Sequence, residues 1–182
     1  MTDIRFDGRV ATVTGAGNGL GRAYALELAG RGAKVVVNDL GSTLSGDRAD
    51  DEVMKSLVGE IIAAGGEAVA HFGDVGSSED MQSMIDLAIG TWGRVDILVA
   101  NAGLVGGTRG DGTLFDSNGA WEKSLRVNLL GVVNPLRAAW PHFAEQKYGR
   151  AVLTSSSSMM GTPGDGHYQA AKAGVVGLTK VI

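Results

Sequence analysis

Five short apolar runs alternate with longer amphipathic stretches, and this alternation limits the fold more than any other feature of the chain. The runs lack a strict apolar/polar period and are rich in valine, isoleucine or leucine, which is typical of strands buried on both faces. They cover 9–13, 34–38, 67–72, 95–100 and 150–155, and the helical patterns cover 19–31, 47–64, 78–91, 118–146 and 167 to the end. This order predicts one α/β domain over 1–182, with a Rossmann-type doubly wound parallel sheet in three α/β/α layers.

Composition narrows the classes of protein to which the chain can belong. Its 182 residues are 44% apolar and 20% charged, which is typical of one soluble globular domain. The net charge of −4 argues against nucleic acid or an anionic membrane as a partner. The apolar runs of about five residues are far shorter than the ~20 that span a bilayer. The N-terminus has no apolar segment of a secretory signal, so we expect a cytoplasmic protein.

The content of cysteine and histidine excludes several kinds of chemistry. The chain has no cysteine, so disulfides, thiolate metal ligands and cysteine nucleophiles are excluded. Its three histidines lack the spacing of metal ligands, and no metal site is expected. The last residues, GHYQAAKAGVVGLTKVI, have the pattern of a helix that is still running. We therefore expect the chain to be truncated at its C-terminus.

A glycine-rich turn, TGAGNGLG, follows the first apolar run and leads into a helical pattern. Gly15, Gly19 and Gly21 suit a tight turn, a close approach of the backbone and a helix–strand contact, as a dinucleotide diphosphate requires. Leu20 stands where the general G-x-G-x-x-G pattern has its last glycine, so the spacing differs from that pattern. Asp39 ends the second run, 24 residues beyond Gly15, where a carboxylate can accept hydrogen bonds from the adenosine ribose. These residues predict dinucleotide binding.

The spacing of these glycines resembles the TGxxxGxG cofactor turn of the short-chain dehydrogenase/reductase family, and further motifs of that family follow in order. Asp74-Val75 resembles its adenine contact, Asn101-Ala102-Gly103 its NAG motif, and Tyr168 with Lys172 its YxxxK motif, thirteen residues after Ser155. The resemblance implies a catalytic set of Asn128, Ser155, Tyr168 and Lys172. It implies cofactor contacts from Gly15, Asn18, Gly19, Leu20, Gly21, Asp39, Asp74, Val75, Asn101, Ala102, Gly103, Tyr168 and Lys172.

The chemistry of the YxxxK pair agrees with this resemblance. Tyr168 and Lys172 are four residues apart, so on a helix they share one face. A phenol with a pKa of about 10 needs about 4 kcal/mol of preference for the phenolate to act as a base near pH 7. A nearby ammonium and an oxidised nicotinamide can supply that preference. Tyr168 would then exchange a proton with an alcohol, Lys172 would hold the nicotinamide ribose, and Ser155 would bind the substrate oxygen. Asn128, where it interrupts its helix, would hold a water behind Lys172.

The residues near Asp39 favour NAD over NADP. A 2′-phosphate beside the Asp39 carboxylate would be repelled. The neighbouring positions Asn18 and Leu40, where NADP-dependent members of the family usually place a base, are uncharged. Arg22, one turn into the helix, is a cation that can in principle reach this position.

We therefore expect an NAD-dependent oxidoreductase that acts on a small-molecule secondary alcohol or ketone. The first 40 residues also resemble the dehydrogenase domains of peroxisomal multifunctional enzymes and their bacterial relatives, which suggests a 3-hydroxyacyl thioester. The family resemblance implies a homodimer or homotetramer built through the helices near 118–146 and 167. It also implies that the part of the fold that covers the substrate, after Lys172, is absent. Two alternatives are a nucleotide-sensing scaffold and a fragment that binds NAD without turnover.

Overall fold

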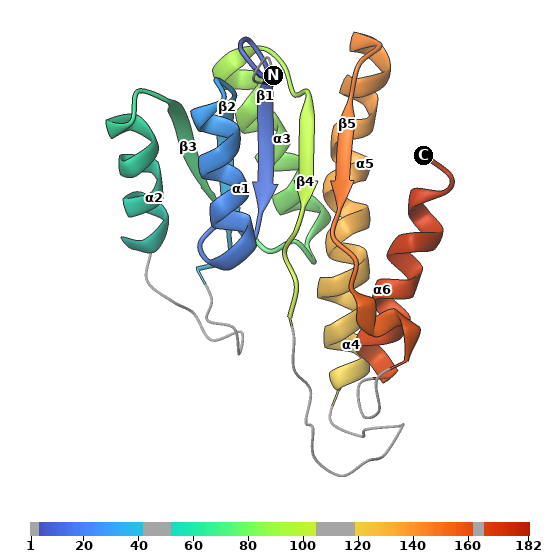
Figure 1. Cartoon of the computed structure of the whole chain (residues 1–182). Coiled ribbons are helices and arrows are strands. Elements are labelled where there is room, and N and C mark those ends of the chain that lie inside the picture. The colour runs from blue at the N-terminus through green and yellow to red at the C-terminus, as the bar shows by residue number, and fades with distance from the viewer. Residues whose placement is uncertain (1–3, 42–51, 105–118, 162–165) are drawn as a thin grey trace.

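A computed structural model of the chain describes residues 4–41, 52–104, 119–161 and 166–182. Its centre is a parallel sheet of five strands in the order β3-β2-β1-β4-β5 (Figure 1). The strands are β1 (Val10–Thr14), β2 (Lys34–Asp39), β3 (Glu67–Phe72), β4 (Ile97–Ala100) and β5 (Arg150–Leu153). The predicted doubly wound, Rossmann-type parallel sheet is confirmed.

Helices cover both faces of this sheet (Figure 1). Helices α1 (Gly19–Gly30) and α2 (Glu52–Ala63) pack on one face, and α3 (Ser78–Trp92) and α5 (Gly131–Gln146) pack on the other. Helix α6 (Gly166–Thr179) adds Val175 to the second of these cores. No helix in the described part of the chain is long and apolar enough to cross a membrane.

The pattern of the apolar runs has a direct structural cause. Val35 and Val37 of β2 enter the core under α1 and α2, whereas Val36 enters the core under α3 and α5. All three side chains are fully buried, because successive residues of a strand point to opposite faces and both faces are covered. Burial of one such valine contributes about 1.5–3 kcal/mol.

The predicted helix over 118–146 divides into three segments. They are α4 (Ala120–Leu125), a π-helical turn η1 (Arg126–Leu130) and α5. Pro135 lies inside α5 and lacks the N–H that would bond to the Gly131 carbonyl, so a kink at this position stays a prediction; α5 itself runs to Gln146. A departure from α-helical geometry comes about two turns before Pro135, at the π-helical segment that contains Asn128.

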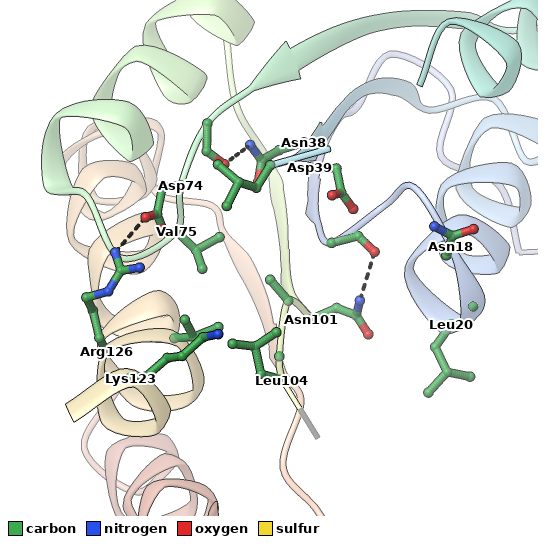
Figure 2. Close-up of a pocket in the computed structure, with 17 residues that line it drawn as sticks. Asn18, Leu20, Asn38, Asp39, Asp74, Val75, Asn101, Leu104, Lys123 and Arg126 are labelled. Atoms are coloured by element: carbon green, nitrogen blue, oxygen red, sulfur yellow. Dashed lines mark hydrogen bonds and ion pairs between the residues drawn. The ribbon is translucent and has the colours of Figure 1, made fainter. Parts of the chain in front are cut away.

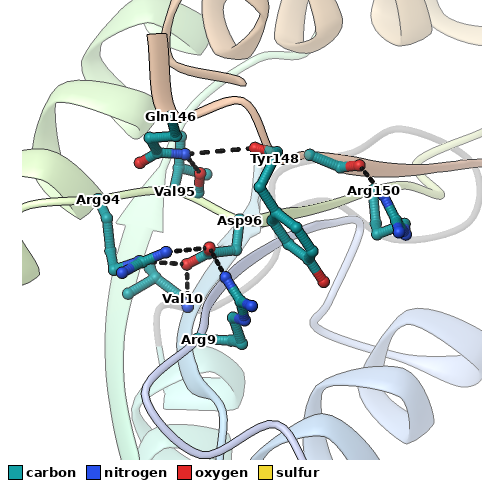
Figure 3. A network of polar contacts seen from close by, with 9 residues as sticks. Arg9, Val10, Arg94, Val95, Asp96, Gln146, Tyr148 and Arg150 are labelled. Atoms are coloured by element: carbon teal, nitrogen blue, oxygen red, sulfur yellow. Dashed lines mark hydrogen bonds and ion pairs between the residues drawn. The ribbon is translucent and has the colours of Figure 1, made fainter. Parts of the chain in front are cut away.

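A polar network ties together the ends of the strands that lie opposite the predicted site (Figure 3). Asp96, fully buried before β4, accepts hydrogen bonds from Arg94 Nε at 2.7 Å, Arg9 Nη1 at 2.8 Å and Val10 N at 3.0 Å. Burial alone would raise the pKa of Asp96, but the Arg94, Val10 and Arg9 hydrogen bonds outweigh it and lower that pKa. The guanidinium of Arg9 also lies 3.8 Å from the centroid of the Tyr148 ring. The network joins β1, β4 and the segment before β5.

Candidate active site

A pocket of about 400 Å³ lies at the carboxyl ends of β1, β2 and β4, beside the loop after β3 (Figure 2). This is the edge where an open parallel sheet binds ligands. Ten of the eleven residues that the sequence assigns to the cofactor, Tyr168 and Lys172 aside, line it, and Gly21 does not. Its walls consist of Gly15, Asn18, Gly19, Leu20, Asn38, Asp39, Leu40, Gly73, Asp74, Val75, Asn101, Ala102, Gly103, Leu104, Lys123, Arg126 and Val127.

The glycine turn forms one wall of the pocket, and its shape requires glycine. Gly15 and Gly19 have φ of 65° and 55°, in the left-handed region that favours glycine. A Cβ on Gly21 would overlap the carbonyl oxygen of Gly15, and a Cβ on Gly15 would lie 2.8 Å from Ala102 Cα. Gly21 therefore acts behind the pocket, where it lets α1 pack closely against the turn.

The N-terminus of α1 is open toward this pocket. Its N-cap residue, Asn18, makes no side-chain capping bond, and the first turn of α1 contains no acidic residue. Helix α3 differs, because the Ser77 hydroxyl accepts a bond from Asp80 N at 3.1 Å and two acids follow in the first turn. The first N–H groups of α1 are thus left for a ligand, and they suit the anionic diphosphate of a dinucleotide.

Asp39 is held at the pocket wall by two backbone groups. Its Oδ2 accepts a hydrogen bond from Gly17 N and its Oδ1 accepts one from Gly41 N, each at 3.0 Å. Arg22, the cation considered for this position, instead forms an ion pair with Glu60 on α2. The structure therefore places the Asp39 carboxylate beside the glycine turn and directs Arg22 elsewhere.

The segment after β4 is bonded to the end of β1. The buried Thr14 hydroxyl accepts hydrogen bonds from Asn101 N at 3.0 Å and from Ala102 N at 3.1 Å. The Asn101 amide in turn donates to the carbonyl oxygens of Thr14 and Gly15 at 3.1 and 3.3 Å. These bonds hold the Asn101–Gly103 segment and the glycine turn as one unit.

The expectations from sequence include neither Lys123 nor Arg126, which both line the pocket. Figure 2 shows both side chains reaching toward it from the helical segment beneath. They are three residues apart on the segment that leads to Asn128, so they share one helix face. That spacing is the signal from which sequence reasoning could have found them.

The four predicted catalytic residues lie close together next to the pocket, on η1, after β5 and on α6. Lys172 is 2% exposed, and its Nζ donates to Thr154 O at 2.8 Å and lies 5.8 Å from the centroid of the Tyr168 ring. Burial disfavours the charged amine and lowers the pKa of Lys172 from its usual 10.5 to about 8. The Ser155 hydroxyl donates to the Lys172 carbonyl oxygen at 2.8 Å.

Asn128 links this cluster to the pocket. Its side-chain amide donates to Leu104 O at 3.1 Å and accepts from Leu104 N at 3.0 Å, so it fixes the chain just after Gly103. A Cβ on Gly103 would lie 2.9 Å from Asn128 Oδ1 and 3.5 Å from Lys172 Nζ. Gly103 thus stands where the pocket and the catalytic cluster meet, and Asn128 lies in the π-helical turn between α4 and α5.

The sequence profile of the family described as short chain dehydrogenase matches residues 9–182. The chain belongs to the short-chain dehydrogenase family. Its membership agrees with the parallel sheet, the glycine turn and the spacing of Ser155, Tyr168 and Lys172.

Two relatives of this short-chain dehydrogenase show how much of a longer protein it matches. It is 48% identical over 180 residues to the peroxisomal multifunctional enzyme type 2 of Drosophila melanogaster, with 98% of this chain and 29% of that protein covered. It is 40% identical over 175 residues to a 3-oxoacyl-[acyl-carrier-protein] reductase of Synechocystis, with 96% of this chain and 66% of that protein covered.

A solved structure resembles this short-chain dehydrogenase closely. Carveol dehydrogenase from Mycobacterium avium, crystallised in complex with NAD, superposes with a TM-score of 0.87 at 33% identity. The match covers 96% of this chain and 64% of that chain. The chain therefore spans less than two thirds of the length of this structure and of the Drosophila enzyme.

Proposed function

We propose that this short-chain dehydrogenase binds NAD in its pocket and transfers a hydride between NAD and a secondary alcohol or ketone. The observation that carries the proposal is the junction at Gly103. Gly103 lines the pocket, and its Cα faces both the Asn128 amide and the Lys172 amine. A dinucleotide that enters at the glycine turn therefore extends toward the catalytic cluster.

Different pocket residues would bind different parts of the dinucleotide, according to their chemistry. The open N–H groups at the start of α1 would hold the diphosphate. The Asp39 carboxylate would accept hydrogen bonds from the adenosine ribose, and Asp74 and Val75 would contact the adenine. Lys172 and Tyr168, beyond Gly103, would hold the nicotinamide ribose.

Tyr168 would move the proton of the reaction. The nicotinamide, when bound, supplies the acceptor or donor of a hydride. The Tyr168 phenol takes the proton from the alcohol oxygen in oxidation and returns it in reduction. The Lys172 amine, 5.8 Å from the ring centroid, stabilises the phenolate while it is charged. Because the pKa of Lys172 is lowered to about 8, this help declines just above neutral pH.

Ser155 has to change its hydrogen bond in order to bind a substrate. Its single O–H group now donates to the Lys172 carbonyl oxygen. Donation to a substrate oxygen requires the hydroxyl to rotate away from that carbonyl. Met159 Sδ lies 3.7 Å from Ser155 Oγ, so an apolar, flexible side chain stands beside the proposed position of the substrate oxygen.

We further propose a 3-hydroxyacyl thioester, or a comparable secondary alcohol, as the substrate. Its support is the 48% identity to a multifunctional enzyme and the 40% identity to a reductase named for 3-oxoacyl thioesters. A homodimer or homotetramer that contacts through the helices near 118–146 and 167 is proposed on the family resemblance alone. We also propose a cytoplasmic location.

Binding of NAD without turnover is the second candidate function. One observation favours it: the Ser155 hydroxyl donates its hydrogen bond to the Lys172 carbonyl oxygen. A nucleotide-sensing scaffold would share this behaviour. The complete set of Asn128, Ser155, Tyr168 and Lys172 argues for turnover, because a sensor needs no proton transfer.

One pair of measurements tests these readings. Calorimetric titration with NAD measures binding, and absorbance of NADH during incubation with secondary alcohols and 3-hydroxyacyl thioesters measures turnover. Binding with NADH formation supports the proposed oxidoreductase. Binding without NADH formation from any of these alcohols supports the second candidate, and no binding overturns both.

A further inference from the structure

Arg126 reaches the pocket from a different element than the carboxylate it contacts. It is the first residue of the π-helical turn η1, and its Nη1 donates to Asp74 Oδ2 at 2.5 Å across 52 residues of sequence. The other carboxylate oxygen, Oδ1, accepts a hydrogen bond from Gly76 N at 2.7 Å. Figure 2 shows the guanidinium of Arg126 facing the Asp74 carboxylate at the edge of the pocket. Each oxygen of Asp74 thus has one partner, and each keeps an acceptor position for a ligand.

The surrounding chain is packed to keep Arg126 in this place. A Cβ on Gly76 would lie 2.9 Å from both Cγ and Cζ of Arg126, so the absence of a side chain at Gly76 makes room for the arginine. Two further contacts join the same helical segment to the loop after β3. A Cβ on Gly131 would lie 2.6 Å from Val75 Cγ2, and Asn134 Nδ2 donates to Val75 O at 2.9 Å.

The two acidic side chains that line the pocket differ in the groups that hold their carboxylate oxygens. Both oxygens of Asp39 are held by backbone N–H groups, whereas Asp74 has a backbone group on one oxygen and a guanidinium on the other. The Arg126 side chain is 47% exposed and that of Asp74 24%, so the ion pair contributes little to folding stability. Its value lies in orientation, because a guanidinium holds a carboxylate in a defined direction.

We propose that Arg126 is a positioning residue that holds the Asp74 carboxylate as a hydrogen-bond acceptor, and that it thereby makes the pocket select a 6-amino purine over a 6-oxo purine. The inference rests on the proposed binding of NAD. The amino group of adenine donates to a carboxylate, whereas hypoxanthine has a keto oxygen at the same position, which would face the carboxylate acceptor to acceptor. Val75 and Val127 supply the apolar surface against which either base would pack equally well.

The test compares the dissociation constants of NAD and of its 6-oxo analogue, nicotinamide hypoxanthine dinucleotide, by calorimetric titration. The wild-type chain is expected to prefer NAD by about tenfold or more, as for the loss of a hydrogen bond to a charged group. In Arg126→Met the ratio is expected to fall to within about threefold. Gly76→Ala, which displaces the arginine without removing a charge, is expected to lower the ratio in the same direction.

Two matched controls separate positioning from general damage. Gly90→Ala places a Cβ where no atom lies within 4 Å, and Arg5→Met breaks an exposed ion pair with Asp7. Both are expected to keep the wild-type ratio. If Arg126 only supports the structure, Arg126→Met should weaken the binding of both dinucleotides by the same factor and leave the ratio of their dissociation constants unchanged. That result would overturn this inference and leave the proposed function standing. A wild-type chain that binds both dinucleotides equally also overturns this inference, and one that binds neither overturns the proposed function with it.

Discussion

The pocket half and the catalytic half of this molecule are built on different parts of the sheet. The pocket lies over β1, β2 and β4, which have neighbours on both sides, and every residue of β4 is buried. Ser155 follows β5, which is an edge strand among the strands that the structure describes and has Val152 53% exposed. The strands that carry the pocket are therefore more deeply buried than β5, which leads to Ser155.

The polar groups of the two halves are also satisfied in different ways. Asp39 and Asp74 are held by N–H groups and a guanidinium, which leaves their acceptor positions open to a ligand. Ser155 and Lys172 instead donate to backbone carbonyl oxygens, those of Lys172 and Thr154. Under the proposed function, nucleotide binding would need little rearrangement, whereas turnover would require the Ser155 hydroxyl to leave the Lys172 carbonyl oxygen. We therefore expect binding and turnover to be separable by substitution.

The largest expected effect breaks turnover and leaves binding intact. Tyr168→Phe removes the hydroxyl that we propose moves the proton and keeps the ring, so turnover should fall by a factor of about 100 to 10,000. The dissociation constant of NAD should stay within about threefold of the wild-type value. Steady-state NADH formation and calorimetric titration measure the two quantities. Retention of more than about a tenth of the wild-type turnover would exclude Tyr168 as the acid/base.

A second change, at Asp96, should lower the stability of the whole fold. Asp96 lies at the end of the sheet opposite the pocket, where its hydrogen bonds join the starts of β1 and β4. Asp96→Asn leaves Arg9 and Arg94 without their buried carboxylate, which should lower the free energy of unfolding by about 3 kcal/mol at neutral pH. The pKa of Asp96 is lowered in the folded state, so its contribution is present above the unfolded pKa and is lost as pH falls through the folded pKa. Urea unfolding at pH 7 and in acid measures this. Equal unfolding free energies for wild type and variant at pH 7 would contradict it.

A third change tests the cost of burying the Lys172 amine. The pKa of Lys172 is about 8 in the folded chain against its ordinary 10.5, so between these values the unfolded chain binds the additional proton. Wild-type stability should therefore rise between pH 8 and 10.5, by at most about 3 kcal/mol. Lys172→Met should remove this contribution to the rise. Chemical unfolding as a function of pH, with the exposed Lys55→Met as control, measures the slopes, and parallel slopes for all three chains would contradict the burial argument.

The smallest expected effect is a preference of the pocket for NAD over NADP, and it tests whether the Asp39 carboxylate faces the ribose. NAD should bind at least about tenfold more tightly than NADP, because a 2′-phosphate beside Asp39 is repelled and Arg22 is paired with Glu60. Asp39→Asn keeps an acceptor for Gly17 N but removes the charge, so it should reduce the preference. Dissociation constants of both cofactors decide this. Equal constants for NAD and NADP in the wild type would show that the carboxylate does not face the ribose.

Several features of the protein could be read from its sequence because they depend on residues close together in the chain. The conformation of Gly15 and Gly19, the burial of β2 on both faces and the position of Asp39 all follow from local pattern. These signals are short-range and act through backbone conformation and hydrophobic period. The set of Asn128, Ser155, Tyr168 and Lys172 was predicted from the resemblance to the family and not from local pattern.

Only the tertiary structure decided the rest. The contact of Arg126 with Asp74 joins residues 52 apart, and that of Arg9 with Asp96 joins residues 87 apart. The π-helical turn at Asn128, the bond of the Ser155 hydroxyl to Lys172 and the burial that lowers the pKa of Lys172 depend on how η1, the segment after β5 and α6 pack. Sequence by itself determined which chemical groups this protein has and in which order they follow along the chain. Packing between distant segments determined their charge, direction and partners, because burial and ion pairing arise only when those segments meet.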